Sequence, residues 1–75
     1  MKFDDLELDG TVKIKPIELN FWQRGPHVIH LISFNGKDSE GRFRFDFFYR
    51  SGLALHGIFS DEKEFEKFTK DVEKL

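Results

Sequence analysis

Cysteine is absent from this 75-residue sequence, and long apolar runs are absent as well. The first absence excludes disulfides, zinc sites with thiolate ligands and iron–sulfur clusters. Small domains often need such cross-links, because a chain of this length buries only about 60–65% of the surface that it exposes when unfolded. Stability must therefore come from hydrophobic packing, for which ten phenylalanines supply large apolar side chains.

The second absence excludes a membrane-spanning helix, which needs roughly 20 consecutive apolar residues. The first five residues, Met1 to Asp5, include two acidic side chains and no apolar segment, so they do not predict a signal peptide. The lack of cysteine is compatible with a reducing compartment. We therefore expect a cytoplasmic protein with no membrane partner.

A strong charge of one sign is also missing, since twelve Lys and Arg face fourteen Asp and Glu for a net charge of −2. Residues 1–10 carry one Lys and four acids, residues 11–59 seven basic and four acidic side chains, and residues 60–75 four Lys and six acids. Nucleic-acid-binding domains are normally strongly basic, so the balance disfavours a nucleic-acid partner. Glycines occur singly, with no phosphate-binding motif, and we predict no cofactor.

The residue pattern predicts one small α+β domain spanning residues 1–75. We expect an antiparallel β-meander of about five strands, strongly curved or barrel-like, with one C-terminal amphipathic helix packed on it. A three-residue loop at Asp9-Gly10-Thr11 would pair Leu8 with Val12 and Leu6 with Ile14. The apolar phase changes after Ile14, and Pro16 lies at the change, which predicts a bulge near Lys15-Pro16.

The last hairpin has the clearest pattern, because Phe43, Phe45, Phe47 and Tyr49 alternate with other residues. A loop at Arg50-Ser51-Gly52 would then pair four residue couples across the hairpin: Tyr49 with Leu53, Phe47 with Leu55, Phe45 with Gly57, and Phe43 with Phe59. One face is then almost entirely apolar, and Gly57 leaves room for a ring.

The helix is predicted over residues 60–75. Ser60 or Asp61 would cap it, and Asp61 to Glu64 resembles a capping box. One apolar stripe follows the helical period and consists of Phe65, Phe68, Val72 and Leu75.

The strand at residues 27–34, followed by a polar loop at 35–41, has two possible registers. With Phe34 opposite Arg42, His30 faces Asp46, which the last hairpin places opposite His56. Two histidines and one carboxylate are a ligand set for a metal ion or an acid–base centre, although Asp46 accepting a hydrogen bond from histidine is a simpler interpretation. A shift of one residue would instead bury His30 on the phenylalanine face. The pattern leaves both registers open, and we predict no metal site beyond this weak candidate.

The segment 21–26 leaves the sheet as a loop that contains Phe21, Trp22 and Arg24. Tryptophan and arginine are over-represented among the residues that dominate protein interfaces, so the loop is a candidate recognition element. The alternative is that Trp22 folds over the open end of the sheet and closes a small core.

The outer face of the last hairpin carries Phe48, Ala54 and Ile58, an apolar patch that a partner or the first hairpin would have to cover. Arg42 and Arg44 lie beside these aromatics, an arrangement that single-stranded nucleic-acid-binding proteins use for stacking and phosphate contacts. Ordinary solvated strand positions would give the same pattern.

No catalytic motif is present, and we predict that the chain is not an enzyme. The expected function is a non-catalytic protein-binding module, inhibitor or adaptor that acts through a sheet face and the Trp22 loop. Its partner would be another protein, a second copy of this chain included. The first alternative is a single-stranded nucleic-acid-binding domain that uses the arginine and aromatic face. The second is a metal or ligand site at His30, Asp46 and His56.

Overall fold

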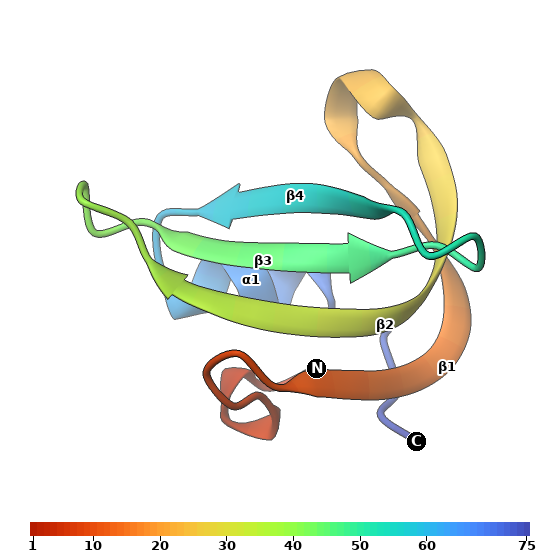
Figure 1. Ribbon diagram of the computed structural model, residues 1–75, viewed down its shortest axis with the longest axis horizontal. Helices are drawn as coiled ribbons and strands as arrows, with labels where there is room; N and C mark the ends of the chain where they lie inside the picture. The colour runs from red at the N-terminus through yellow and green to blue at the C-terminus, as the bar shows by residue number, and fades with distance from the viewer.

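The computed structural model describes every residue of the chain except the side chain of Gln23. Over the described residues, four antiparallel strands form one sheet in the order β1-β2-β3-β4, followed by a helix (Figure 1). The strands are β1 (Thr11–Asn20), β2 (Pro26–Lys37), β3 (Phe43–Phe48) and β4 (Ala54–Phe59). Two 3-10 turns, η1 (Phe3–Asp5) and η2 (Trp22–Arg24), accompany the helix α1 (Glu62–Phe68). The α+β class is confirmed, whereas a fifth strand and a barrel-like curvature are not.

The strands β1 and β2 bend together, and a bulge marks the bend. Lys13 pairs with Leu31 and Ile17 pairs with Ile29, so three residues of β1 lie opposite the single residue His30. This confirms the bulge expected near Pro16, where a proline cannot donate a ladder hydrogen bond. Beyond the bend, the far halves of both strands and η2 stand away from the rest of the sheet (Figure 1).

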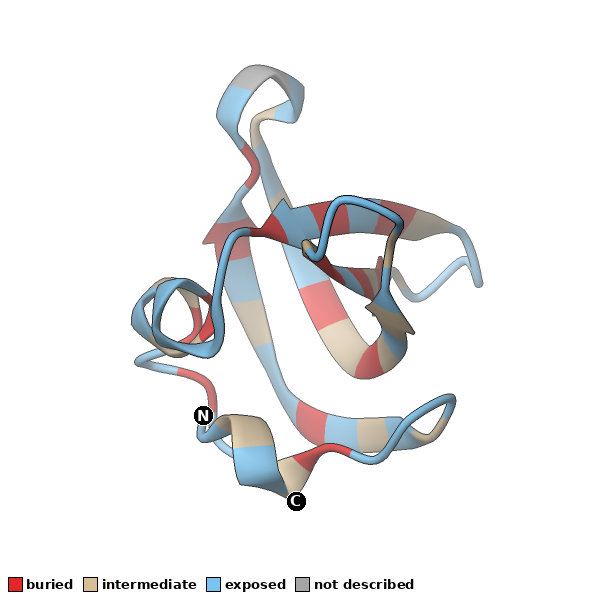
Figure 2. Cartoon of the chain, turned by 90° about the vertical axis from the view of Figure 1, so that its left-hand side faces the viewer, coloured by how far each residue is buried: buried red, intermediate tan, exposed pale blue. Residues whose placement is uncertain are grey.

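The last hairpin has the predicted register. Phe43 pairs with Phe59, Phe45 with Gly57, and Phe47 with Leu55, while Tyr49 N donates to Leu53 O at 2.8 Å. Buried and exposed positions alternate along the strands, as Figure 2 shows. The buried face meets the helix, where the rings of Phe45 and Phe65 stack with their centroids 4.2 Å apart.

The N-terminal segment does not form the predicted hairpin. Residues 3–5 form η1, and Leu8 makes a parallel bridge to Phe34, so the expected pairing of Leu8 with Val12 is wrong. The ring of Phe3 packs edge-on against several core rings, among them Phe34 at 4.9 Å and Phe65 at 6.4 Å. A short isolated hairpin is only marginally stable in water. The free energy gained by packing the Phe3 side chain therefore exceeds the free energy that the predicted hairpin would gain.

The helix is shorter than the predicted 60–75. Asp61 caps it, because its Oδ1 accepts a hydrogen bond from Glu64 N at 2.8 Å, but the helix ends at Phe68. The following residues turn back to the open edge of β1, where Lys15 N donates to Glu73 O at 2.9 Å and Leu75 N donates to Lys13 O at 3.0 Å. Strand pairing therefore replaces the last helical turns, and Leu75 is 71% exposed instead of packing in the apolar stripe.

The strand β2 extends three residues beyond the predicted 27–34, so the expected loop at 35–41 is shorter. A second bulge between Phe34 and Gly36 adjusts the register to β3. In the part of the chain that the structure describes, no helix has the length and apolar character needed to span a membrane.

Candidate functional site

Trp22 is the most unusual residue on the surface. Its side chain is 66% exposed, and its φ of 43° lies in the left-handed region that bulky residues rarely adopt. Such backbone strain, about 1–3 kcal/mol, is found preferentially at functional sites. The indole ring stacks on Phe68 at 5.5 Å with an interplanar angle of 7° and lies 6.2 Å from Phe59. Trp22 therefore covers an edge of the core with one face and presents the other to solvent.

Hydrogen bonds within the loop hold η2 in place. Phe21 N donates to Gly25 O at 2.9 Å, and Arg24 N donates to Phe21 O at 2.7 Å. His27 Nε2 donates to Arg24 O at 2.8 Å. Gly25 has a φ of 75°, which glycine adopts at no steric cost. The loop is therefore a fixed support for Trp22 and Arg24.

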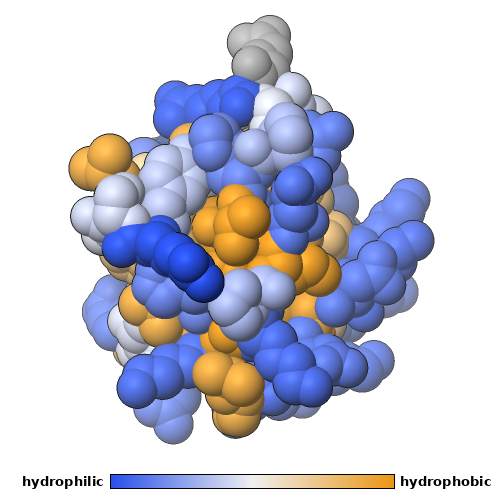
Figure 3. All heavy atoms as spheres, turned by 90° about the vertical axis from the view of Figure 1, so that its right-hand side faces the viewer, coloured by the Kyte–Doolittle hydropathy of each residue, from blue (hydrophilic) through white to orange (hydrophobic). Residues whose placement is uncertain are grey.

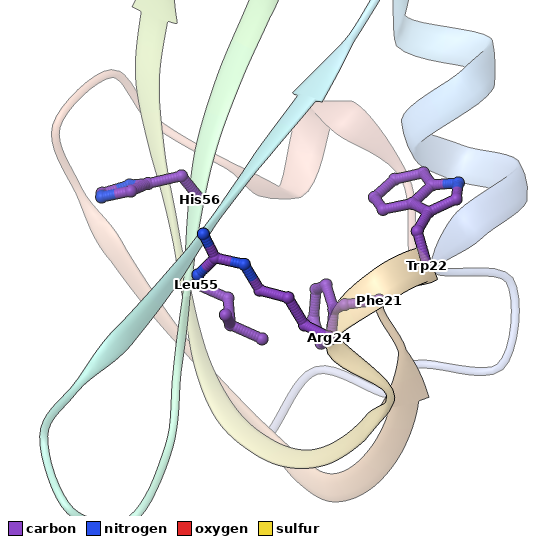
Figure 4. A pocket seen from close by; sticks show the side chains of 5 residues that line it. All are labelled: Phe21, Trp22, Arg24, Leu55 and His56. Carbon is purple, nitrogen blue, oxygen red and sulfur yellow. The ribbon is translucent and has the colours of Figure 1, made fainter.

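Two clefts meet at Trp22. The first, of about 390 Å³, is lined by Phe21, Trp22 and Arg24 from the loop and by Leu55 and His56 from β4. Figure 4 shows Arg24 reaching from η2 to β4, where its guanidinium ends beside Leu55, while the ring of His56 points the other way. Phe21 is only 3% exposed and acts mainly as a core residue.

The second cleft, of about 470 Å³, lies between Trp22, β1, β4 and the helix. Its apolar lining is Leu19, Trp22, Phe59 and Phe68, and its polar lining is Glu18, Asn20, Glu64, Lys67 and Lys70. Trp22 thus lines both clefts and separates them. Apolar side chains on the neighbouring face that carries the bend of β1 and β2 gather in one central area bordered by polar residues (Figure 3).

The arginines Arg42 and Arg44 do not form a free basic patch. The Nε atoms of both lie 3.0 Å from Asp38 Oδ2, and the Asp38 side chain is only 11% exposed. Burial raises the pKa of Asp38, but hydrogen bonds from the backbone of Arg42 and Glu40 and from both guanidinium groups have the larger combined effect. They lower the pKa to about 2. The sequence analysis missed Asp38, although an aspartate in a polar turn signals side-chain hydrogen bonds to nearby backbone N–H groups.

We expect Asp38→Asn to weaken the fold at neutral pH and to flatten its acid dependence. The pKa of Asp38 is lowered on folding from 3.8, so its contribution is complete above that value and is lost as the pH falls toward 2. Thermal unfolding of both proteins, followed by circular dichroism between about pH 4 and pH 2, measures this. Equal slopes of Tm against pH in the wild type and the variant would contradict the assignment.

The three candidate metal ligands are not brought together. Asp46 pairs with His56 as predicted, and Oδ1 of Asp46 is hydrogen-bonded to Nδ1 of His56. Ser33, not His30, lies opposite Asp46, and His30 shares the strand alternation of Ile32, which pairs with Phe47. The buried Nδ1 of His30 has no hydrogen-bond partner among the described residues. The register of β2 to β3, with a shorter connecting loop than predicted and a bulge between Phe34 and Gly36, separates His30 from the other two. Among the described residues, no group of three or more His, Asp or Glu side chains could hold a metal ion.

The outer-face residues Phe48 and Ile58 lie on a different face from Trp22. Phe48 is half-buried beside Leu31 and Ala54, and Ile58 is 39% exposed beside Arg44. The Asp46 and His56 pair lies between them and divides the predicted apolar patch. The structure therefore joins Trp22 and Arg24 in one site and leaves Phe48 and Ile58 outside it.

Comparison with other proteins does not assign this site to a known family. The chain matches no protein family model, no curated protein and no solved structure. Its function must therefore be argued from its own surface.

Proposed function

We propose that this chain is a non-catalytic protein-binding module, an inhibitor or an adaptor, that contacts its partner through Trp22, Arg24 and the neighbouring edge of β4. The exposure of Trp22 on a strained backbone carries the proposal. A small domain without disulfides gains stability by burying its only tryptophan. This one keeps two thirds of the side chain in solvent.

The chemistry of the loop supports a protein partner. Tryptophan and arginine contribute most to binding when they fill pockets at the centre of an interface. Arg24 forms no ion pair with any described residue, so its charge is available to an acidic partner group. Hydrogen bonds of the loop fix the backbone that carries both residues before binding, which lowers the entropy cost of ordering the loop on association.

The single-stranded nucleic-acid alternative receives less support. It requires Arg42 and Arg44 to contact phosphates, but Asp38 is bound to both. The proposed site has one free arginine and lies in a protein with a net charge of −2. We place the protein in the cytoplasm as part of the same proposal.

A pull-down with matched variants tests the proposal. The tagged wild type, Trp22→Ala and Leu53→Ala are incubated with lysate of the source organism, with and without nuclease, and bound proteins are quantified by mass spectrometry. Leu53 is the control because it is 67% exposed, as Trp22 is, but lies in the turn between β3 and β4. We expect a partner that Leu53→Ala retains and that Trp22→Ala binds about tenfold less or worse, the loss typical of an interface hot spot.

Two results would reject the proposal. One is a partner that binds the wild type and Trp22→Ala equally. The other is material that nuclease removes from all three proteins, which would move the function to nucleic-acid binding.

A further inference from the structure

The strand β4 is an open and unprotected edge of the sheet. Tyr49 N donates to Leu53 O, so these two form a hydrogen-bonded pair, and such pairs alternate along an antiparallel ladder. The residues at the other positions, Ala54, His56 and Ile58, therefore turn their N–H and C=O groups away from β3. In the described part of the chain, no hydrogen bond from outside the sheet reaches these groups.

The two edges of the sheet, β1 and β4, differ in how far they are protected from pairing with another strand. Residues 73–75 cover part of the β1 edge with backbone hydrogen bonds, and the bulge at residues 14–16 interrupts it. β4 has neither protection, because its register to β3 is regular and its sequence, Ala54 to Phe59, contains no Lys, Arg, Asp, Glu or Pro. Soluble proteins usually protect long edges with such devices, since an exposed edge pairs with other strands.

Two clefts along β4 could bind the side chains of an extended peptide. Leu55 and His56 line the first cleft, Phe59 lines the second, and Trp22 is the wall of both. Residues of an added strand would point alternately to the two faces of the sheet. Those on the Trp22 side would meet apolar side chains and the guanidinium of Arg24.

We infer that β4 recognises an extended segment of the partner protein, which adds to the sheet as a further strand and places an acidic side chain beside Arg24. The inference rests on the proposed function for the location of the contact. It adds a binding mode, in which backbone hydrogen bonds supply affinity and alternate side chains supply specificity. A second copy of this chain is a poorer occupant, because residues 54–59 contain no Asp or Glu to pair with Arg24.

The test begins with a displayed library of linear ten-residue peptides that is selected on the full chain. We expect binders with alternating apolar residues and at least one Asp or Glu. Backbone amide exchange, followed by NMR, should then slow about tenfold or more at His56 and Ile58 when a selected peptide is added, because these N–H groups become hydrogen-bonded. Arg24→Glu should weaken the peptide about tenfold, whereas Arg50→Glu, in the turn between β3 and β4, should not.

A proline variant gives an independent measurement. Ile58→Pro removes an N–H that points away from β3, so it should abolish peptide binding while the β3–β4 ladder survives. The exchange experiment needs no variant, so it tests whether the peptide pairs with β4 even if Ile58→Pro does not fold.

The possible failures are distinguishable. If selected peptides bind but leave exchange at His56 and Ile58 unchanged, strand addition is wrong while recognition through Trp22 stands. The same holds if no peptide is selected but a Trp22-dependent partner is captured from lysate. Protection of these amides by concentration-dependent dimerisation, without any peptide, would overturn the inference in favour of a second copy. Loss of both peptide and lysate partner would reject the proposed function itself.

Discussion

Replacing Phe65 with alanine should destabilise the protein by about 3–5 kcal/mol, the usual cost of removing a fully buried phenylalanine. Phe65 is 0% exposed, stacks on Phe45 at 4.2 Å and meets Phe3 and Phe59 edge-on. It thus touches the sheet and the N-terminal turn together. A domain of this size has roughly 4–11 kcal/mol in total, so the change should remove a large share of its stability.

Urea denaturation followed by circular dichroism and by tryptophan fluorescence measures the loss. Phe68→Ala is the matched control, because Phe68 lies one helical turn away but is only partly buried. We expect a smaller effect there, which differs from the sequence pattern that gave both residues the same role. An equal or greater loss in Phe68→Ala would show that the helix is anchored at its end and not at Phe65.

Gly57→Ala should cost about 1–3 kcal/mol although it adds only one methyl group. A Cβ at this position would lie 2.6 Å from Cε1 of Phe47 and 3.2 Å from Cε2 of Phe59. Phe47 is 0% exposed and packs against Phe21 and Phe68 at 5.2 and 5.7 Å, so its ring has little freedom to move away. The packed core, and not a special backbone conformation, requires glycine here.

A double variant distinguishes this explanation from a loss of strand formation. Phe47→Leu removes the ring atoms that the new methyl group would meet, so Gly57→Ala should cost much less in that background than in the wild type. The free energies of unfolding of the four proteins, measured in urea, give the coupling. Strictly additive effects would mean that the methyl group does not meet Phe47.

The parts of the fold that the sequence predicted correctly rest on local pattern. Alternating phenylalanines set the register of β3 and β4, including the position of Gly57, and Pro16 marked the bulge in β1. The Asp61 cap was also visible, because it depends on residues within one helical turn. In each case the structure-forming contacts lie within a few residues or across one tight turn.

The parts that were wrong depend on contacts between distant segments. The turn at Asp9-Gly10 suits a hairpin, but the partly buried Phe3 packs against rings from β2, β3 and α1, and this cannot be read from the turn. The helix pattern continues to Leu75, yet residues 73–75 pair with β1. The register of β2 to β3 follows from the extension of β2 to Lys37 and the bulge between Phe34 and Gly36, and it places Ser33 instead of His30 opposite Asp46.

The candidate site was predicted in part. Trp22 and Arg24 stood out by residue type and loop position, and the structure brings them together at one cleft. Phe48 and Ile58 were grouped with them only because strand alternation ignores the bend of β1 and β2. The open edge of β4 was not predicted, since it depends on strand order and on which edge the C-terminal residues cover.

The way in which the two ends of the chain pack together has a consequence for synthesis on the ribosome. Phe3 N donates to Glu66 Oε2 at 2.7 Å, and residues 73–75 bond to Lys13 and Lys15. These contacts join residues that are translated early to residues that are translated later, and Phe65 completes the core only when it has emerged. Until Phe65 has emerged, the apolar face of strands β3 and β4 remains exposed to solvent. We expect nascent chains of this protein to fold only after residues 65–75 have left the ribosome, and to depend on chaperones until then.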